Sequence, residues 1–283
     1  MDFTNDRCVT LAKDVGITGI GLHSGIGAEV VLRPSSLGGV VIRRGDVSGG
    51  NFALRADMVQ KSPLCTLLDN GDGVQVSTVE HLLSALHGLR LDSVIIEING
   101  PEVPILDGSA IPWVDLIDTV GRADVERERN WLKVAKPVVE DAEGRVLLAN
   151  PDARLGLRVE CVIDFPHAGI GRQVWKGIVD EATYRREIAP ARTFVQEKDI
   201  AAAQAAGLAK GGSLENAVVF GENGGVLNKG GLRFEDEPVR HKVLDLIGDI
   251  YMEGRCVSGA FAVTAPGHVA NNMLLRKIVA GAE

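Results

Sequence analysis

Short apolar runs rich in Val and Ile, interrupted by Gly and Pro, recur along the whole chain. Runs of about four to eight such residues between turn residues are typical of strands. In the first half they predict strands at residues 28–32, 40–43, 74–77 and 93–98. In the second half they predict strands at residues 131–134, 145–149, 156–163, 171–175 and 258–264.

Apolar residues at helical spacing predict helices between and after these strands. Four leucines between positions 82 and 89 indicate a helix at 78–89, and Ser77 or Thr78 would cap its first turn. Further helices are expected at residues 110–120, 199–208, 237–252 and 271–280. Each half of the chain therefore presents strands first and helices later, which favours an α+β fold over a parallel α/β sheet.

Residues 121–130 are charged and weakly patterned, which indicates either a boundary between domains or the solvated end of a helix. We expect a boundary, with an N-terminal α+β domain at 1–125 and a C-terminal α+β domain at 126–283. The length of 283 residues agrees with this division, because a domain commonly holds about 100–150 residues. A strand–helix–strand insert is expected in the second domain near 191–220.

The composition is that of a soluble globular protein, with 45% hydrophobic and 24% charged residues. A net charge of −8 and the lack of a basic run argue against a nucleic-acid partner. The four cysteines are far apart, which argues against a disulfide framework and a thiolate zinc site. No secretory apolar segment follows Met1, and no run of about 18 apolar residues occurs. We therefore expect a cytoplasmic protein without an integral membrane segment.

Side chains able to bind a metal lie along the helix expected at 237–252. His241, Asp245 and Asp249 follow one another at intervals of four residues, which places them on one helix face. The opposite face is apolar. One nitrogen and one oxygen at this spacing are suitable metal ligands, but a solvent-exposed polar stripe has the same pattern.

Two further segments carry candidate chemistry. Glu80 and His81 begin the helix expected at 78–89, so the histidine could be a third metal ligand and the carboxylate a base for water. His268 lies between a strand and a helix, where it could protonate a leaving group or stabilise an oxyanion. Taken singly, each segment has a structural alternative: a helix cap beside a packed histidine, or a turn histidine bonded to backbone.

Several longer motifs occur in one order along nearly the whole chain. They include Gly19-Ile20-Gly21-Leu22-His23-Ser24-Gly25, Leu64-Cys65-Thr66, Ser77-Thr78-Val79-Glu80-His81-Leu82, Ile105-Leu106-Asp107-Gly108-Ser109-Ala110, Ala191-Arg192-Thr193-Phe194, Gly212-Ser213-Leu214-Glu215-Asn216, Pro238-Val239-Arg240-His241-Lys242 and Gly267-His268. In these motifs the sequence resembles the UDP-3-O-acyl-N-acetylglucosamine deacetylases, zinc enzymes of lipid A biosynthesis. It departs from that family at Thr264-Ala265-Pro266, where a basic residue that contacts phosphate often precedes the Gly–His pair.

The resemblance implies two α+β domains of similar topology, each with a sheet and a pair of helices, and with the helices packed between the sheets. It implies one zinc ion bound by His81, His241 and Asp245. The implied catalytic residues are Glu80 as general base, His268 as cationic acid, Asp249 as its orienting partner and Thr193 as an oxyanion donor. The implied substrate contacts are Lys242, Phe194, His23, Leu64, Cys65, Gly211 and Ser213.

The implied reaction hydrolyses the acetamide of UDP-3-O-acyl-N-acetylglucosamine and releases acetate and UDP-3-O-acyl-glucosamine. We expect a monomer whose partner is this acylated UDP-sugar, with at most transient proximity to a membrane. Three alternatives stay open at this point: a closed structural zinc site, a metal-free module that binds sugar nucleotides, and an amidase for another N-acetyl substrate. Scattered positions for His81, His241 and Asp245 would favour the metal-free module.

The segment 199–209 is rich in alanine and precedes Gly211 and Gly212. Such small side chains leave room beside a helix, and strand-like stretches at 191–195 and 217–220 flank it. In the resembling family an insert of this kind forms an apolar passage for the acyl chain. The alternative is a helix packed tightly on its own sheet, where alanine serves only as a good helix former.

Overall fold

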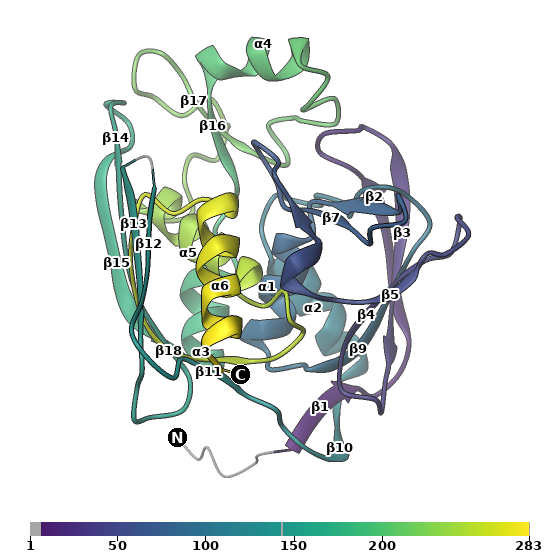
Figure 1. Ribbon diagram of the computed structural model, residues 1–283. Coiled ribbons are helices and arrows are strands. Elements are labelled where there is room, and N and C mark those ends of the chain that lie inside the picture. Colours follow the sequence, from purple (N-terminus) through teal and green to yellow (C-terminus); the bar gives the residue numbers. More distant parts are fainter. Residues whose placement is uncertain (1–6, 143, 283) are drawn as a thin grey trace.

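The structure is a computed structural model and describes residues 7–142 and 144–282. Two mixed sheets face each other, and the main helices lie between them (Figure 1). The first sheet contains β2 (Val15–Ile20), β3 (Gly27–Pro34), β4 (Gly39–Arg44), β5 (Asn51–Ala53) and β9 (Ser93–Ile98). The second contains β11 (Leu132–Lys133), β12 (Val138–Ala142), β13 (Arg145–Asn150), β14 (Leu157–Phe165), β15 (Gly171–Val179) and β18 (Val257–Thr264). The expected α+β layered fold is confirmed.

The two sheets repeat one strand order. The order is β2-β3-β9-β4-β5 in the first and β12-β13-β18-β14-β15 in the second, where β11 also pairs with β18. In both sheets the last strand along the chain is central, with an antiparallel neighbour on one side and a parallel neighbour on the other. The two halves of the chain thus build sheets of the same connectivity.

Four helices lie between the sheets, and they carry most of the candidate chemistry. They are α1 (Glu80–Gly88), α2 (Ile111–Val120), α5 (Glu237–Asp249) and α6 (His268–Ala282). Helices α1 and α5 approach so closely that a Cβ on Gly248 would stand 2.1 Å from the carbonyl oxygen of Glu80, a contact that only glycine avoids. All of α1 and nearly all of α5 is buried, so their polar side chains need partners inside the protein. The solvent-exposed polar stripe considered for 237–252 is therefore wrong.

Smaller elements complete the fold. A three-stranded sheet of β6 (Val59–Gln60), β7 (Leu67–Asp69) and β8 (Gln75–Ser77) precedes α1, a 3-10 turn spans Ala56–Met58, and α3 (Glu181–Thr183) runs into a π-helical turn at Tyr184–Ile188. The expected insert is present at the top of Figure 1 as β16 (Phe194–Gln196), α4 (Glu197–Ala205) and β17 (Val218–Phe220), with its two strands parallel. Across the described residues, no helix is both long and apolar enough to span a bilayer.

The charged segment at 121–130 is mainly a strand. It forms β10 (Arg122–Glu128), which pairs antiparallel with β1 (Arg7–Leu11). Nearly every side chain of β10 is exposed, so the segment shows no alternation of apolar and polar residues from which a strand could be predicted. The expected boundary after residue 125 falls inside this strand, and the division into two domains stays a prediction.

Helix α1 begins without the cap expected from the sequence. Val79 occupies the N-cap position, and no side chain there bonds the first turn. Thr78 instead has a φ of 56°, in the left-handed region, and its hydroxyl donates to Glu102. The cap expected from Ser77 or Thr78 is therefore wrong, because the Thr78 hydroxyl donates to Glu102 and the Ser77 hydroxyl donates to the Pro101 carbonyl.

Candidate active site

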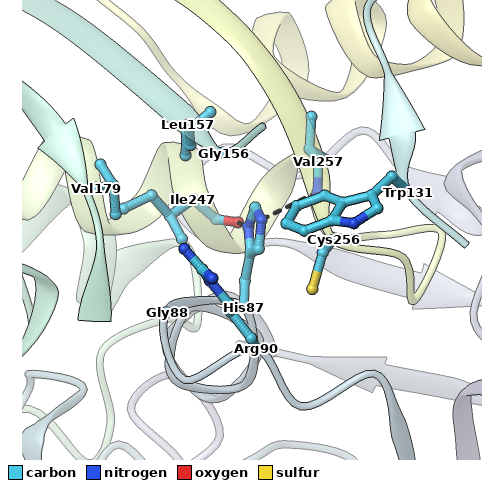
Figure 2. A pocket seen from close by; sticks show the side chains of 10 residues that line it. All are labelled: His87, Gly88, Arg90, Trp131, Gly156, Leu157, Val179, Ile247, Cys256 and Val257. Carbon is cyan, nitrogen blue, oxygen red and sulfur yellow. Dashed lines mark hydrogen bonds between the residues drawn. The ribbon is translucent and has the colours of Figure 1, made fainter. Parts of the chain in front are cut away.

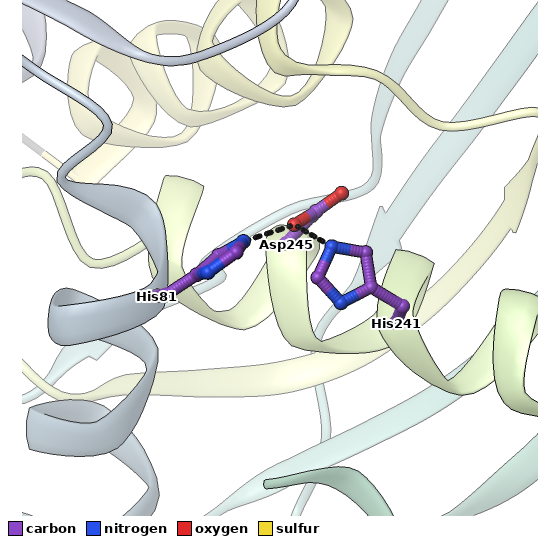
Figure 3. A group of neighbouring side chains, drawn as sticks. All are labelled: His81, His241 and Asp245. Carbon is purple, nitrogen blue, oxygen red and sulfur yellow. Dashed lines mark ion pairs between the residues drawn. The ribbon is translucent and has the colours of Figure 1, made fainter. Parts of the chain in front are cut away.

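Three buried side chains from α1 and α5 converge between the sheets (Figure 3). His81 comes from the first turn of α1, and His241 and Asp245 from successive turns of α5. Asp245 Oδ1 lies 3.2 Å from His241 Nε2 and 3.7 Å from His81 Nε2. Ligand atoms around a tetrahedral zinc ion are about 3.4 Å apart for bonds of about 2.0–2.1 Å. The spacing therefore fits one ion of this size.

Hydrogen bonding around the cluster also favours a cation. His241 Nδ1 lies 3.0 Å from the carbonyl oxygen of Ala191, so in the neutral ring Nδ1 carries the proton and Nε2 directs a lone pair toward Asp245. Asp245 Oδ1 is buried and makes no hydrogen bond. Two buried acceptors that face each other are unfavourable unless a cation lies between them. Among the described residues this is the one such group of histidine, cysteine and acidic side chains.

The protonation of these groups suits metal binding. Burial, together with the neighbouring His241, lowers the pKa of His81 to about 3, so its ring is neutral at pH 7. Burial opposes ionisation of Asp245, but His241, when its ring is protonated, and the charged Lys242 favour the carboxylate and keep the pKa of Asp245 well below the usual value. Lys242 Nζ lies 2.9 Å from Asp245 Oδ2 and so holds the carboxylate oxygen that faces away from the two histidines.

A second group of side chains adjoins the three possible ligands. His268, the first residue of α6, places Nε2 3.9 Å from Glu80 Oε1 and Nδ1 2.9 Å from Asp249 Oδ2. Asp249 also accepts hydrogen bonds from Asn271 Nδ2 at 2.8 Å and from Thr66 Oγ1 at 2.6 Å. The backbone N–H of Thr66 donates to Glu80 Oε2 at 3.1 Å. Both carboxylates are therefore held in fixed orientations.

The environment gives Glu80 and His268 different acidities. Burial raises the pKa of Glu80 to about 7, although the nearby His268 opposes the shift. Burial lowers the pKa of His268, but the Asp249 carboxylate outweighs it and raises that pKa to about 9. At neutral pH His268 is protonated while Glu80 can exchange a proton, which is the division of tasks needed for a general acid and a general base.

An apolar cavity of about 270 Å³ lies beside these groups, between the insert and the loops before α1. Five residues expected to act in the site line it: His23, Leu64, Thr193, Phe194 and Ser213. Phe194 connects it to the three possible metal ligands, because the ring centroid of Phe194 lies 6.4 Å from that of His241. The tightly packed alternative for the alanine-rich helix is wrong, because Ala203 of α4 also lines the cavity.

The chain matches known proteins over nearly all of its length. The family model of UDP-3-O-acyl N-acetylglycosamine deacetylase matches residues 9–280. The UDP-3-O-acyl-N-acetylglucosamine deacetylase of Shewanella frigidimarina is 42% identical over 96% of this chain and 89% of its own length. The enzymes of that name from Histophilus somni and Pasteurella multocida are each 42% identical over 97% of this chain and 90% of their own length. The chain belongs to the UDP-3-O-acyl-N-acetylglucosamine deacetylase family. It is therefore a deacetylase, a class of hydrolase.

Two of the residues expected to contact substrate, Gly211 and Cys65, do not line this cavity of the deacetylase. Gly211 does not line the cavity: its N–H donates to the carbonyl of Leu22, and a Cβ on Gly211 would stand 2.2 Å from the carbonyl oxygen of Gly21. Its neighbour Gly212 lines the cavity instead. Cys65 is buried, and its burial, together with the negative charge of Glu80, raises the pKa of its thiol to about 11.

The sequence did not assign roles to several residues that hold the candidate catalytic groups. Thr66 bonds both Glu80 and Asp249, Asn271 bonds Asp249, and the Ala191 carbonyl orients His241. All three lie within or next to motifs shared with the deacetylase family, so their position in those motifs was the available signal. Their hydrogen bonds join segments far apart in the chain, which no local pattern reveals.

A further buried histidine, His87, lies in the last turn of α1 and serves the fold (Figure 2). Its Nδ1 lies 3.0 Å from the carbonyl oxygen of Ile247, and its Nε2 accepts from the N–H of Val257 at 3.1 Å. The adjoining cavity measures about 20 Å³, room for about one water molecule, so no substrate fits there. Burial lowers the pKa of His87 to about 4.

His87 should make the stability of the deacetylase depend on pH. Its pKa is lowered in the folded state, so between pH 6.5 and about 4 the unfolded chain binds more protons, and stability falls as pH falls through this range. Below pH 4 this shift in pKa corresponds to a loss of about 3 kcal/mol in the free energy of unfolding. Glutamine in His87→Gln keeps a donor and an acceptor but does not titrate. In urea unfolding, the free energy of unfolding of this variant should therefore fall less between pH 6.5 and 4 than that of the wild type. Equal pH slopes for variant and wild type would contradict this role.

Proposed function

We propose that this deacetylase is zinc-dependent and hydrolyses the acetamide of UDP-3-O-acyl-N-acetylglucosamine in lipid A biosynthesis in the cytoplasm. The observation that carries the proposal is the group of His81, His241 and Asp245, whose acceptor atoms face one another beside Glu80. The relatives that match nearly the whole chain are named for that substrate. A closed structural zinc site is disfavoured, because the group supplies three ligands and leaves an adjacent carboxylate free to act.

The side chains divide the reaction as follows. Zinc held by the three ligands would polarise the acetamide carbonyl and lower the pKa of water at the site. Glu80 takes a proton from the water while the water oxygen attacks the carbonyl carbon. The Thr193 hydroxyl donates a hydrogen bond to the oxyanion that forms. The C–N bond then breaks, and the amine takes a proton from His268 Nε2 or from protonated Glu80. Acetate and a free amino sugar leave.

Asp249 is proposed to act through His268 alone. Its carboxylate bonds His268 Nδ1, so Nε2 is the nitrogen that carries a transferable proton toward Glu80 and the substrate. Asn271 and Thr66 bind the remaining lone pairs of Asp249 and fix its orientation. This arrangement keeps the histidine cationic until the amine leaves.

The remaining polar groups are assigned to the sugar nucleotide. We place the diphosphate near Lys242, whose Nζ lies at the edge of the site, 5.7 Å from the ring centroid of Phe194. Phe194 is assigned to the sugar or base. His23 is buried with neither ring nitrogen bonded, and it lies at a cavity that is otherwise mainly apolar, so it is suited to a polar atom near the acyl ester. Leu64 and Ser213 would contact the acyl chain.

Acetate release from two substrates tests the proposal. Burial of four methylenes in the cavity would strengthen binding by about 3 kcal/mol, or roughly 200-fold. We therefore expect kcat/KM for the acylated UDP-sugar to exceed that for the same sugar nucleotide without its acyl chain by about two orders of magnitude. Purified protein should contain zinc when it shows this activity.

A matched pair of variants on α4 distinguishes an effect on acyl-chain binding in the cavity from an effect on the rest of the site. Ala203 lines the cavity, whereas Ala202 next to it is exposed. Ala203→Phe should lower kcat/KM for the acylated substrate and leave the acyl-free one unchanged, while Ala202→Phe should change neither. Equal kcat/KM for both substrates in the wild type would refute the acyl passage and favour an amidase for another N-acetyl compound.

A further inference from the structure

We propose that Glu102 is a positioning residue that ties one wall of the acyl cavity to the start of the catalytic helix α1. This inference rests on the proposed function and assigns a role to a carboxylate that does not contact the three metal ligands. Glu102 follows β9 and is 2% exposed. Among the described residues, no Lys or Arg pairs with it, so its environment is made of hydrogen-bond donors.

The donors to Glu102 come from two separate segments. On one side, the N–H of His23 donates to Oε1 at 2.8 Å, and the N–H of Ser24 donates to Oε2 at 2.7 Å. On the other side, the Thr78 hydroxyl donates to Oε1 at 2.8 Å. A buried carboxylate that accepts three such bonds is well compensated, and it links the segments that supply the donors.

The first segment, residues 21–25, forms part of the cavity wall. Leu22 and His23 line the cavity, and their carbonyl oxygens accept from the N–H groups of Gly211 and Lys210 in the insert. Glu102 packs directly on this loop, because a Cβ on Gly21 would stand 2.3 Å from Oε2. The carboxylate thus holds the loop that in turn holds the insert.

The second segment leads into the catalytic helix. Thr78 stands two residues before Glu80 and three before His81, with its N–H bonded to the Thr66 carbonyl. Its φ of 56° is costly for a β-branched residue and persists only where neighbouring contacts hold it. The bond from its hydroxyl to Glu102 is such a contact. Loss of this bond would let the chain relax and would shift the first turn of α1.

The choice of a carboxylate, rather than an amide, follows from the donors around it. In Glu102→Gln the amide oxygen could keep the bonds of His23 and Thr78, but the NH₂ group would then face the N–H of Ser24. In the reverse orientation the NH₂ group faces the N–H of His23, while the Thr78 hydroxyl can turn to accept from it. The variant keeps the size of the side chain, and in either orientation one backbone N–H of the loop faces a donor in place of an acceptor, which weakens the link.

The experiment measures zinc affinity by chelator competition and amide hydrogen exchange in Glu102→Gln and Thr78→Val. Removal of a group that orients metal ligands commonly weakens metal binding about 10–100-fold, and we expect a loss in this range for both variants. Exchange should become faster at residues 21–25 and at the first turn of α1 in Glu102→Gln. In Thr78→Val, which keeps both loop bonds, it should become faster mainly at α1.

Glu140 supplies the matched control, because it is a buried acid of β12 in the second sheet and pairs with Lys277 of α6. Glu140→Gln should lower Tm without a change in zinc affinity or in exchange at α1. Unchanged zinc affinity and unchanged exchange at α1 in both Glu102→Gln and Thr78→Val would overturn the proposal. If the wild type releases no acetate, the proposed function fails, and the exchange comparison still decides whether Glu102 links the two segments.

Discussion

Glu80→Gln is expected to keep its zinc and to lose about 10²–10⁴-fold in kcat, the usual contribution of a general base. The amide is nearly the size of the carboxylate, and its oxygen can still accept from the N–H of Thr66. What it lacks is a site that takes a proton at neutral pH, a role that the raised pKa of Glu80, about 7, suits well. Acetate release at saturating substrate and zinc content per chain are the two measurements.

Two results would contradict this assignment. Turnover at the wild-type rate would remove Glu80 from the mechanism, and loss of zinc together with activity would make it a structural support of the ligands. His268→Gln is the companion variant, since His268 faces Glu80 at 3.9 Å and carries the opposite charge. It should also retain zinc and lose rate, because the leaving amine would lack its cationic acid.

The double variant His81→Ala, His241→Ala is expected to lose zinc and essentially all activity. A catalytic zinc site commonly has three protein ligands, and a single carboxylate from Asp245 cannot hold the ion alone. Metal analysis should show about one zinc per chain in the wild type and almost none in the variant. Removal of the metal from the wild type with a chelator should abolish acetate release, and added zinc should restore it.

His87→Gln serves as the control for this prediction, because His87 is a buried histidine of the same helix that bonds only the backbone of α5 and β18. It should retain zinc and activity. Full zinc in the double variant would show that the ion binds elsewhere or that these residues are not its ligands.

The sequence by itself was informative wherever a property depends on neighbours along the chain. The interval of four between His241, Asp245 and Asp249 places them on one helix face whatever the rest of the fold does. The runs of Val and Ile marked strands such as β3, β4 and β9, since burial on a sheet selects for those residues locally. Shared motifs indicated the family, and the family model matches residues 9–280.

Local pattern was insufficient where a distant segment decides the conformation. The exposed ribbon of β10 lacks apolar alternation, and its strand exists because β1 pairs with it. Thr78 resembles a helix cap in sequence, but its hydroxyl goes to Glu102, 24 residues away. Gly211 resembles a residue that makes room for a ligand, yet its lack of a side chain serves the close approach of Gly21.

The candidate catalytic groups could thus be identified from the sequence, whereas the distances between them and their pKa values were decided by the tertiary structure. His81 and Asp245 are 164 positions apart in the chain, and their 3.7 Å separation depends on the packing of α1 against α5 at Gly248. The pKa values of Glu80 and His268 likewise depend on burial and on charges from other elements. Chain-local periodicity specifies which face a side chain occupies, but only packing determines which faces meet and how far water is excluded from the groups between them.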